Sequence, residues 1–192
     1  MSPRSSEQFK ELRDASRQKI LESSLELFGT KGYKSTTISD IVKKAGISKG
    51  LIYHYFDSKE DILKQLVDFF IEGGQEKVSE LMTGSAKDRL NKIIDWFFRE
   101  MREHEHQWAL FINLTVQVHD FDFIHEMATQ KANGYVAMFT ELFRELGYEN
   151  PTAEARILGA LFDGIGMQYY VFNEQDYLTE MEQTLRDKYH LL

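Results

Sequence analysis

The feature that most constrains the fold of this chain is a series of helix N-cap signals, each followed directly by apolar residues at helical spacing. Thr37-Ile-Ser-Asp40 has the form of a capping box, in which Thr37 caps the first turn and Asp40 reaches back from the third helical position. Ser48 is a second N-cap residue, and Ser58-Lys-Glu-Asp61 forms another box. Loops rarely carry such a series, so this segment predicts two short helices followed by a long one.

Helical periodicity also covers the rest of the chain. Apolar residues spaced three or four apart between Ile20 and Phe28 predict a helix that begins near Asp14 and ends at Gly32. Only 2 of the 192 residues are proline, and the sequence has no β-hairpin or repeat signal. Further helices are expected at residues 86–104, 105–118, 122–147, 153–172 and 176–189. The sequence therefore predicts an all-α fold.

Composition excludes several classes of protein. Hydrophobic residues make up 42% of the chain, which is enough for a sizeable core. The absence of cysteine excludes a disulfide scaffold, thiol catalysis and cysteine-bound zinc. The N-terminus lacks the apolar segment of a secretory signal, and no uninterrupted apolar stretch approaches the about 18 residues of a membrane span. We therefore expect a cytoplasmic protein with no cofactor and no membrane partner.

Charge is distributed unevenly along the chain. The net charge is -8, but residues 1–64 carry +3 and residues 65–192 carry -11. A basic head on an acidic body suggests that the two parts have different functions. A split of this size also arises by chance in many chains, so the motifs have to decide the function.

Residues 37–59, TISDIVKKAGISKGLIYHYFDSK, have the pattern of a helix-turn-helix unit, whose second helix enters the major groove of DNA. Ile52 and Phe56 are spaced to pack that second helix on the domain. Gly50 allows close approach of the backbone to DNA, and the hydroxyls of Tyr53 and Tyr55 suit phosphate oxygens. The outward side is expected to carry Lys49, Gly50, Tyr53 and His54. An alternative is that this tyrosine-rich helix binds a protein.

Other basic residues are candidate phosphate contacts. Lys59 lies in the first turn of the following helix, where its ammonium group and the free N–H groups favour an anion. An extended basic arm before the first predicted helix, or along its start, can neutralise phosphates. That arm comprises Arg4, Lys10, Arg13 and Arg17, although a solvated tail is the simpler interpretation for Arg4.

Residues 14–64 resemble the TetR family of bacterial transcriptional regulators, on the elements AGISKG, LIYHYF and SKEDIL. The resemblance implies a three-helix DNA-binding head at residues 1–57 and a larger helical body for ligand binding and dimerisation at residues 58–192. It also implies a homodimer and a small-molecule inducer. Carried over by position, the DNA contacts are Thr37, Ser48, Lys49, Gly50, Tyr53, His54, Tyr55 and Lys59. Two departures are Ile52 in place of a common leucine and the order His54-Tyr55 in place of a frequent Tyr-His.

Aromatic residues concentrate in the body, which holds 19 of the 25. They favour an apolar pocket for a hydrophobic or aromatic effector, with plain core packing as the alternative. The candidate lining residues are Trp96, Trp108, Phe111, Phe121, Tyr135, Phe139, Phe162 and Tyr169. Polar groups that can orient a ligand are Asn113, Gln117, His119 and Gln168. His119, Asp122 and His125 also raise the possibility of a divalent metal, but solvated histidines are the commoner case and no metal is predicted.

Two stripes in the last predicted helices suggest a dimer interface. The first is a ridge of mostly small residues, and the second is an apolar seam at three- and four-residue spacing. They comprise Gly159, Asp163, Gly166 and Tyr170, and Leu178, Met181 and Leu185, respectively. The alternative is that the same helices pack within one chain.

Together these features predict a ligand-responsive, homodimeric repressor that binds an inverted-repeat DNA operator and is released by a small hydrophobic or aromatic effector. An effector-dependent activator or corepressor-type regulator is the alternative. An all-α enzyme lacks support, because the sequence has no glycine-rich phosphate loop, no HExxH motif and no nucleophile paired with a base.

Overall fold

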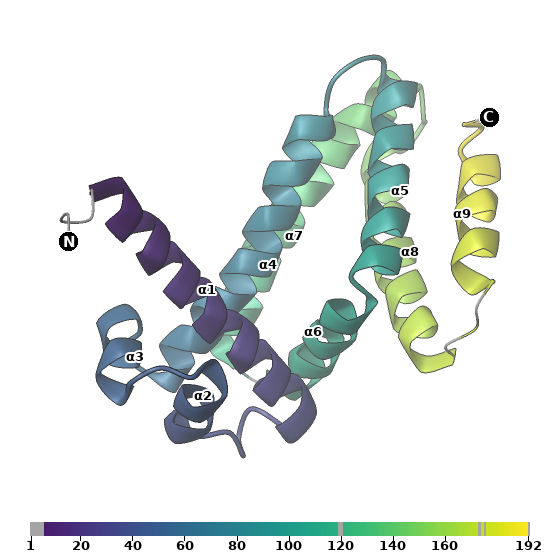
Figure 1. Cartoon of the computed structure of the whole chain (residues 1–192). Coiled ribbons are helices and arrows are strands. Elements are labelled where there is room, and N and C mark those ends of the chain that lie inside the picture. The colour runs from purple at the N-terminus through teal and green to yellow at the C-terminus, as the bar shows by residue number, and fades with distance from the viewer. Residues whose placement is uncertain (1–5, 119–120, 173, 175, 192) are drawn as a thin grey trace. The chain divides into compact units, whose positions relative to one another are not determined.

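All regular structure in the described part of the chain is α-helical (Figure 1). The computed structural model describes residues 6–118, 121–172, 174 and 176–191, without the side chains of residues 6–14, 70–73, 75, 115, 118, 128 and 131. The helices are α1 (Ser6–Lys31), α2 (Ile38–Ala45), α3 (Lys49–Tyr55), α4 (Lys59–Leu81), α5 (Ala86–Glu103), α6 (Glu105–Val118), α7 (Asp122–Glu145), α8 (Pro151–Phe172) and α9 (Tyr177–Lys188). The predicted all-α class is confirmed.

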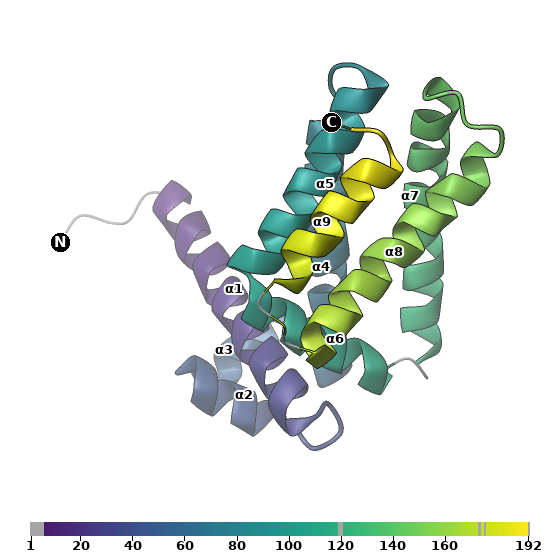
Figure 2. The same cartoon turned by 90° about the vertical axis from the view of Figure 1, so that its right-hand side faces the viewer.

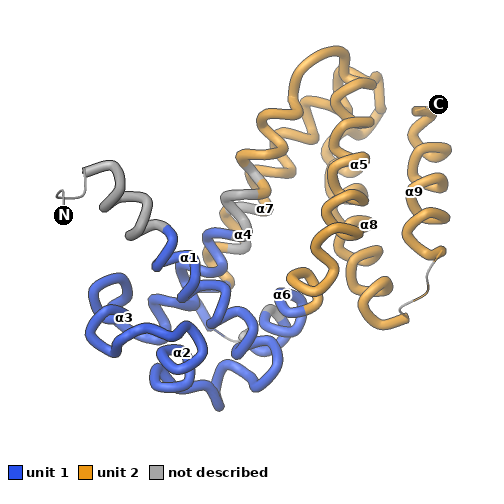
Figure 3. Tube along the Cα trace, viewed as in Figure 1, with its two compact units in different colours: residues 1–69, 110–124 blue, residues 70–109, 125–192 orange. Residues whose placement is uncertain are grey.

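Two compact units divide the chain (Figure 3). The first comprises residues 1–69 and 110–124, and the second comprises residues 70–109 and 125–192. The first unit contains the predicted head together with the beginning of α4 and the end of α6. The predicted domain boundary after residue 57 stays a prediction.

The N-cap signals form as the sequence predicted, with one difference. The Thr37 hydroxyl accepts from the Asp40 N–H, and the Asp40 carboxylate accepts from the Thr37 N–H, so the capping box is complete. Ser58 caps the Asp61 N–H at 3.0 Å, but the Asp61 carboxylate accepts from the N–H of Asp57. The second box is therefore displaced by one residue, because the chain turns at Asp57 before α4 begins.

Packing explains why α2 and α3 are helical at all. Isolated helices of eight and seven residues are marginally stable in water, because their few hydrogen bonds do not offset the free-energy cost of nucleation. In the first unit, α2 packs against both α1 and α3. The core side chains include Ile20, Phe28, Ile41, Ile52, Phe56, Ile62 and Leu63. Burial of this apolar surface holds both short helices in place.

The second unit has its own core, built around the amphipathic helix α5. In this unit α9 packs along α5 and also contacts α8 (Figure 2). The Arg186 guanidinium secures the packing of α9 on α5 by donating to Asn91 at 2.9 Å and pairing with Asp95. It also donates to Glu182 of its own helix at 2.8 Å. Among the helices whose residues the structure describes, none is long and apolar enough to cross a bilayer.

Candidate nucleic-acid interface

Helix α3 is anchored from one side, as the spacing of its apolar residues predicted. Ser48 begins the helix by accepting a hydrogen bond from the Leu51 N–H at 3.2 Å. Only 1% of Ile52 and 2% of Phe56 are exposed, so both side chains lie in the core of the first unit. This leaves the other side of α3 facing outward.

The outward side of α3 carries the residues that the sequence assigned to DNA contact. Lys49, Gly50 and His54 are exposed, and Tyr53 is 51% exposed. Tyr55 is half-buried, and its ring contacts those of His54 and Phe56 at centroid distances of 5.1 and 6.4 Å. The exposed side therefore combines a cation, an imidazole, a phenol hydroxyl and bare backbone.

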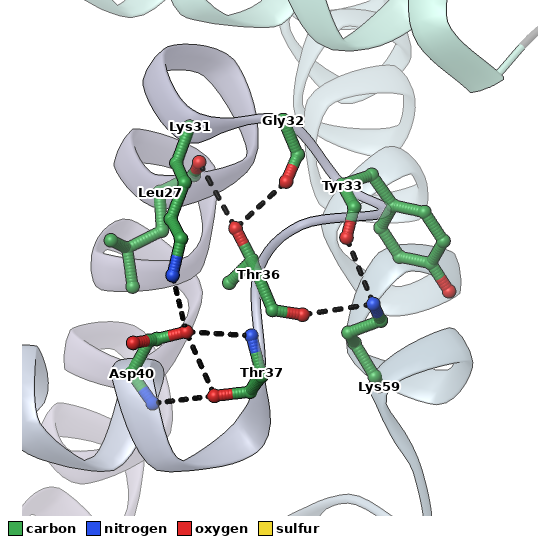
Figure 4. Close-up of polar contacts among 8 residues, drawn as sticks. All are labelled: Leu27, Lys31, Gly32, Tyr33, Thr36, Thr37, Asp40 and Lys59. Carbon is green, nitrogen blue, oxygen red and sulfur yellow. Dashed lines mark hydrogen bonds and ion pairs between the residues drawn. The ribbon is translucent and has the colours of Figure 1, made fainter.

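The first turn of α2 holds a compact polar cluster around Asp40 (Figure 4). The carboxylate of Asp40 pairs with the Lys31 ammonium at 2.7 Å and accepts from the Thr37 hydroxyl at 2.8 Å. The bond from Lys31, followed by those from Thr37, holds the pKa of Asp40 well below its usual value. Thr37, a predicted phosphate contact, thus already uses its hydroxyl in the cap.

Lys59 does not project freely from the start of α4. Its Nζ donates to the carbonyl oxygens of Tyr33 at 2.8 Å and Thr36 at 2.9 Å, and it lies 4.4 Å from the centroid of the Tyr33 ring (Figure 4). Burial lowers the pKa of this ammonium group. The sequence predicted a phosphate ligand here, and it gave no sign of partners that lie 23 and 26 residues away.

Gln117 is a residue of this region that sequence reasoning assigned elsewhere. Its side-chain oxygen accepts from the Tyr33 N–H at 3.0 Å, and its amide nitrogen donates to the Phe28 carbonyl at 3.4 Å. The expectation that Gln117 orients an effector stays a prediction, while the structure shows it bound to the backbone at the end of α1. No sequence signal reveals this contact, because it joins residues 84 and 89 positions apart.

The predicted basic arm is described only in part. Arg4 lies outside the described residues, as do the side chains of Lys10 and Arg13. Arg17 donates two hydrogen bonds to the Gln65 side-chain oxygen, at 2.7 and 3.1 Å, which ties α1 to α4 within the first unit. Its guanidinium is therefore already engaged within the protein.

Two family models account for most of this chain. Residues 20–66 match the model of bacterial regulatory proteins of the tetR family, and residues 86–191 match the C-terminal model of BetI-type transcriptional repressors. The chain belongs to the tetR family of bacterial regulatory proteins. The first match covers α2, α3 and the beginning of α4, so it includes the exposed side of α3.

Individual relatives of this TetR-family protein agree with that assignment. A fatty acid metabolism regulator protein from Bacillus subtilis (strain 168) is 26% identical over 170 residues, covering 82% of this chain and 84% of that protein. The HTH-type transcriptional regulator YerO of the same organism is 33% identical over 93 residues, covering 46% of this chain and 32% of YerO. The match to YerO thus spans about a third of that relative's length.

A solved structure shows the same fold. A transcriptional regulator from Saccharomonospora viridis, in complex with choline, superposes with a TM-score of 0.75 at 22% identity. The superposition covers 91% of this chain and 95% of the other. At this identity the likeness establishes the shared fold alone.

The predicted pocket aromatics of this TetR-family protein divide between the two units. Trp96, Trp108, Tyr135, Phe162 and Tyr169 pack against the core of the second unit, in which Phe139 is buried. Gly74 leaves room for the Tyr135 hydroxyl, which would lie 2.8 Å from a Cβ at that position, and burial raises the pKa of Tyr135 to about 12. Phe111 and Phe121 belong to the first unit, where the Phe121 ring meets that of Tyr33 edge-on at 5.4 Å.

The predicted dimer residues also divide into two groups. Leu178, Leu185 and Gly166 are buried in the second unit, and a Cβ on Gly166 would lie 3.9 Å from Met101 of the same chain. Met181 packs half-buried against the same core, whereas Asp163 and Tyr170 are exposed and Gly159 is half-buried. The seam on α9 is thus used for packing within the chain, which was the alternative interpretation.

The three residues considered as ligands of a divalent metal are described only in part. His119 lies outside the described residues. Asp122 and His125 are both exposed on α7. Within the described residues, no group of three potential metal ligands comes together.

Proposed function

We propose that this protein is a DNA-binding transcriptional repressor that acts as a homodimer, binds an inverted-repeat operator and is released by a small hydrophobic or aromatic effector. The observation that carries the proposal is the two-sided character of α3. Ile52 and Phe56 are buried, Gly50 and His54 are exposed on the opposite side, and Lys49 and Tyr53 are exposed next to them along the helix. Family membership and the basic head support it.

The exposed side of α3 suits the major groove chemically. Lys49 and His54 offer donors to the acceptor atoms of base edges, and the Tyr53 and Tyr55 hydroxyls suit phosphate oxygens. Ser48 and Thr37, at the starts of α3 and α2, lie next to helix N–H groups that favour phosphates. Lys49 would thus supply both charge and sequence readout.

Self-association is supported by an exposed apolar face on α8. Ile157, Met167 and Val171 are 42%, 42% and 61% exposed, and with Gly164 they follow helical spacing along one side of the helix. A face of this kind suits an isologous contact with a second copy. In such a dimer two α3 helices would read successive major grooves about 34–36 Å apart.

An effector site in the second unit is supported by its aromatic residues. Phe162 stacks on Phe97 with centroids 4.2 Å apart, and Tyr135 stacks on Phe139 at 6.0 Å. Aromatic faces suit an apolar chain and also attract a quaternary ammonium group. A relative is named for fatty acid metabolism, so a fatty acid is the first compound to test, and choline, which a structural neighbour contains, is the cationic compound to compare with it.

The sign of regulation is proposed from the BetI-type repressor match. An effector that favours a dimer with the wrong α3 separation would weaken operator binding by about 5- to 150-fold, which is the usual range of coupling. An effector that instead tightens binding would support the corepressor alternative.

The test is the salt dependence of DNA binding by the full chain. The logarithm of affinity should fall linearly with the logarithm of salt concentration, and Lys49→Ala should reduce that slope by about 1. A protein-binding module would show no affinity for DNA. Light scattering at micromolar concentration checks the dimer, and a monomer bound to a single half-site would contradict it.

A further inference from the structure

The loop of residues 32–37 sets where the helix-turn-helix unit begins, because it joins the end of α1 to the N-cap of α2. A helix end leaves its last four carbonyl groups without partners within the helix. Here a side chain distant in sequence binds one of these carbonyls, on Phe28, and another binds two carbonyls of the loop that follows. Within the loop itself, the Thr36 hydroxyl adds hydrogen bonds of 2.8 Å to the Gly32 carbonyl and 3.2 Å to the Leu27 carbonyl (Figure 4).

Gln117 caps the C-terminal end of α1 from α6. Its amide donates to Phe28, one of the last four carbonyls of α1, and accepts from the first N–H after the Gly32 turn. Gly29 permits this approach, because a Cβ there would lie 2.7 Å from the side chain of Leu110 on α6. Gly32, at φ +95°, turns the chain toward the Gln117 oxygen. One side chain thus satisfies a donor of the loop and an acceptor at the end of α1.

Lys59 secures the same loop from α4. It binds the Tyr33 and Thr36 carbonyls, which lie near the two ends of the loop. Thr36 directly precedes the Thr37 cap of α2. An ammonium group has three donors, so two of the three are committed to these backbone oxygens. The Tyr33 ring lies over the same ammonium group and also against Phe121.

We propose that Gln117 and Lys59 are positioning residues for DNA binding, which hold residues 32–37 in the conformation that presents α2 and α3. The inference rests on the proposed DNA-binding function and deepens it. It assigns a part in DNA binding to a residue of α6, outside the helix-turn-helix unit. It also gives Lys59 a role through backbone carbonyls in place of the phosphate contact predicted from its position.

The experiment compares the full-length wild type with Gln117→Leu and Lys59→Met on a DNA fragment that the wild type has selected from a random double-stranded pool. Both variants should bind about 5- to 30-fold more weakly, because the binding-competent loop is less populated when its hydrogen bonds are lost. Their salt slopes should equal that of the wild type, since no phosphate contact is removed. Lys49→Met is the matched control and should lower the slope by about 1.

Two further measurements separate positioning from general destabilisation. Amide hydrogen exchange at Tyr33 should be faster in Gln117→Leu. Lys59→Arg, which keeps two N–H donors, should restore most of the affinity. If Gln117→Leu does not fold, Gln117→Glu takes its place, because it keeps the acceptor for Tyr33 and loses only the donor to Phe28.

The outcomes distinguish this inference from the proposed function. A wild-type chain that binds no DNA overturns both. Wild-type binding that the Gln117 variant leaves unchanged overturns the positioning role alone. A salt slope lowered by about 1 in Lys59→Met would show that Lys59 is a phosphate ligand and would also overturn the proposal.

Discussion

Gly50 is the second residue of α3, and none of the residues that the structure describes requires a glycine there. A Cβ at this position would meet no described atom within 4 Å, and the residue is exposed. Glycine in a helix costs roughly 0.5–1 kcal/mol relative to alanine. Gly50→Ala should therefore raise the free energy of unfolding by about 0.5–1 kcal/mol, which raises the melting temperature by about 1–4 °C for a chain of this size.

The same substitution should weaken DNA binding. If the backbone at Gly50 lies against DNA, an added methyl group is forced into a packed interface, at a cost of about 1–3 kcal/mol. That corresponds to an affinity about 5- to 150-fold weaker. A Gly50→Ala variant that is more stable but binds DNA more weakly would indicate that the bound DNA leaves no room for a side chain at this position.

Thermal unfolding followed by circular dichroism and DNA binding followed by fluorescence anisotropy measure the two effects. Gly46→Ala is the control of opposite sign, because Gly46 caps α2 at φ +62° and alanine there is strained. It should lower the melting temperature. A Gly50→Ala variant that is more stable and binds DNA as tightly as the wild type would remove Gly50 from the interface.

Three further predictions concern the head. Thr37→Ala removes the capping box of α2 and Ser85→Ala removes that of α5, so each should lower the free energy of unfolding in urea by about 1 kcal/mol. Only Thr37→Ala should weaken DNA binding; an equal loss of affinity in both variants would contradict the assignment of α2 to the interface. The lowered pKa of Asp40 means that its pair with Lys31 stabilises the fold above about pH 4 and that this stability is lost as pH falls further. Asp40→Asn should thus be less stable than the wild type at pH 7, and urea midpoints should converge below pH 4; a constant difference would refute this. Ile52→Val should lower stability by about 0.5–1.5 kcal/mol and leave the affinity of the folded protein unchanged, as calorimetry and anisotropy would show.

Local signals in the sequence were sufficient for most of the helices. The predicted segments 86–104, 105–118 and 122–147 correspond to α5, α6 and α7 within two residues at either end. Caps and apolar periodicity act over a few residues, which is why they can be recognised in a single sequence. By contrast, α1 begins at Ser6 and not near Asp14, because its first turns have no apolar stripe to reveal them.

The exposed side of α3 could be predicted because helical geometry alone places Gly50 and His54 opposite Ile52. The contacts of Gln117 and Lys59 could not, because they depend on where α6 and α4 pass the loop. The α9 seam shows another limit. The spacing indicates that Leu178 is buried, but it does not show whether the same chain or a second copy covers it. In the structure, residues of the same chain bury Leu178.

Selection from a random double-stranded DNA pool by the full-length protein tests the central claim most directly. The account predicts enrichment of an inverted repeat whose half-sites are centred about one helical turn, or a multiple of it, apart. Loss of that enrichment in a Lys49→Ala, Tyr53→Phe double variant that still folds would assign it to α3. Recovery of no enriched sequence, or of a motif that the double variant selects equally well, would contradict the account.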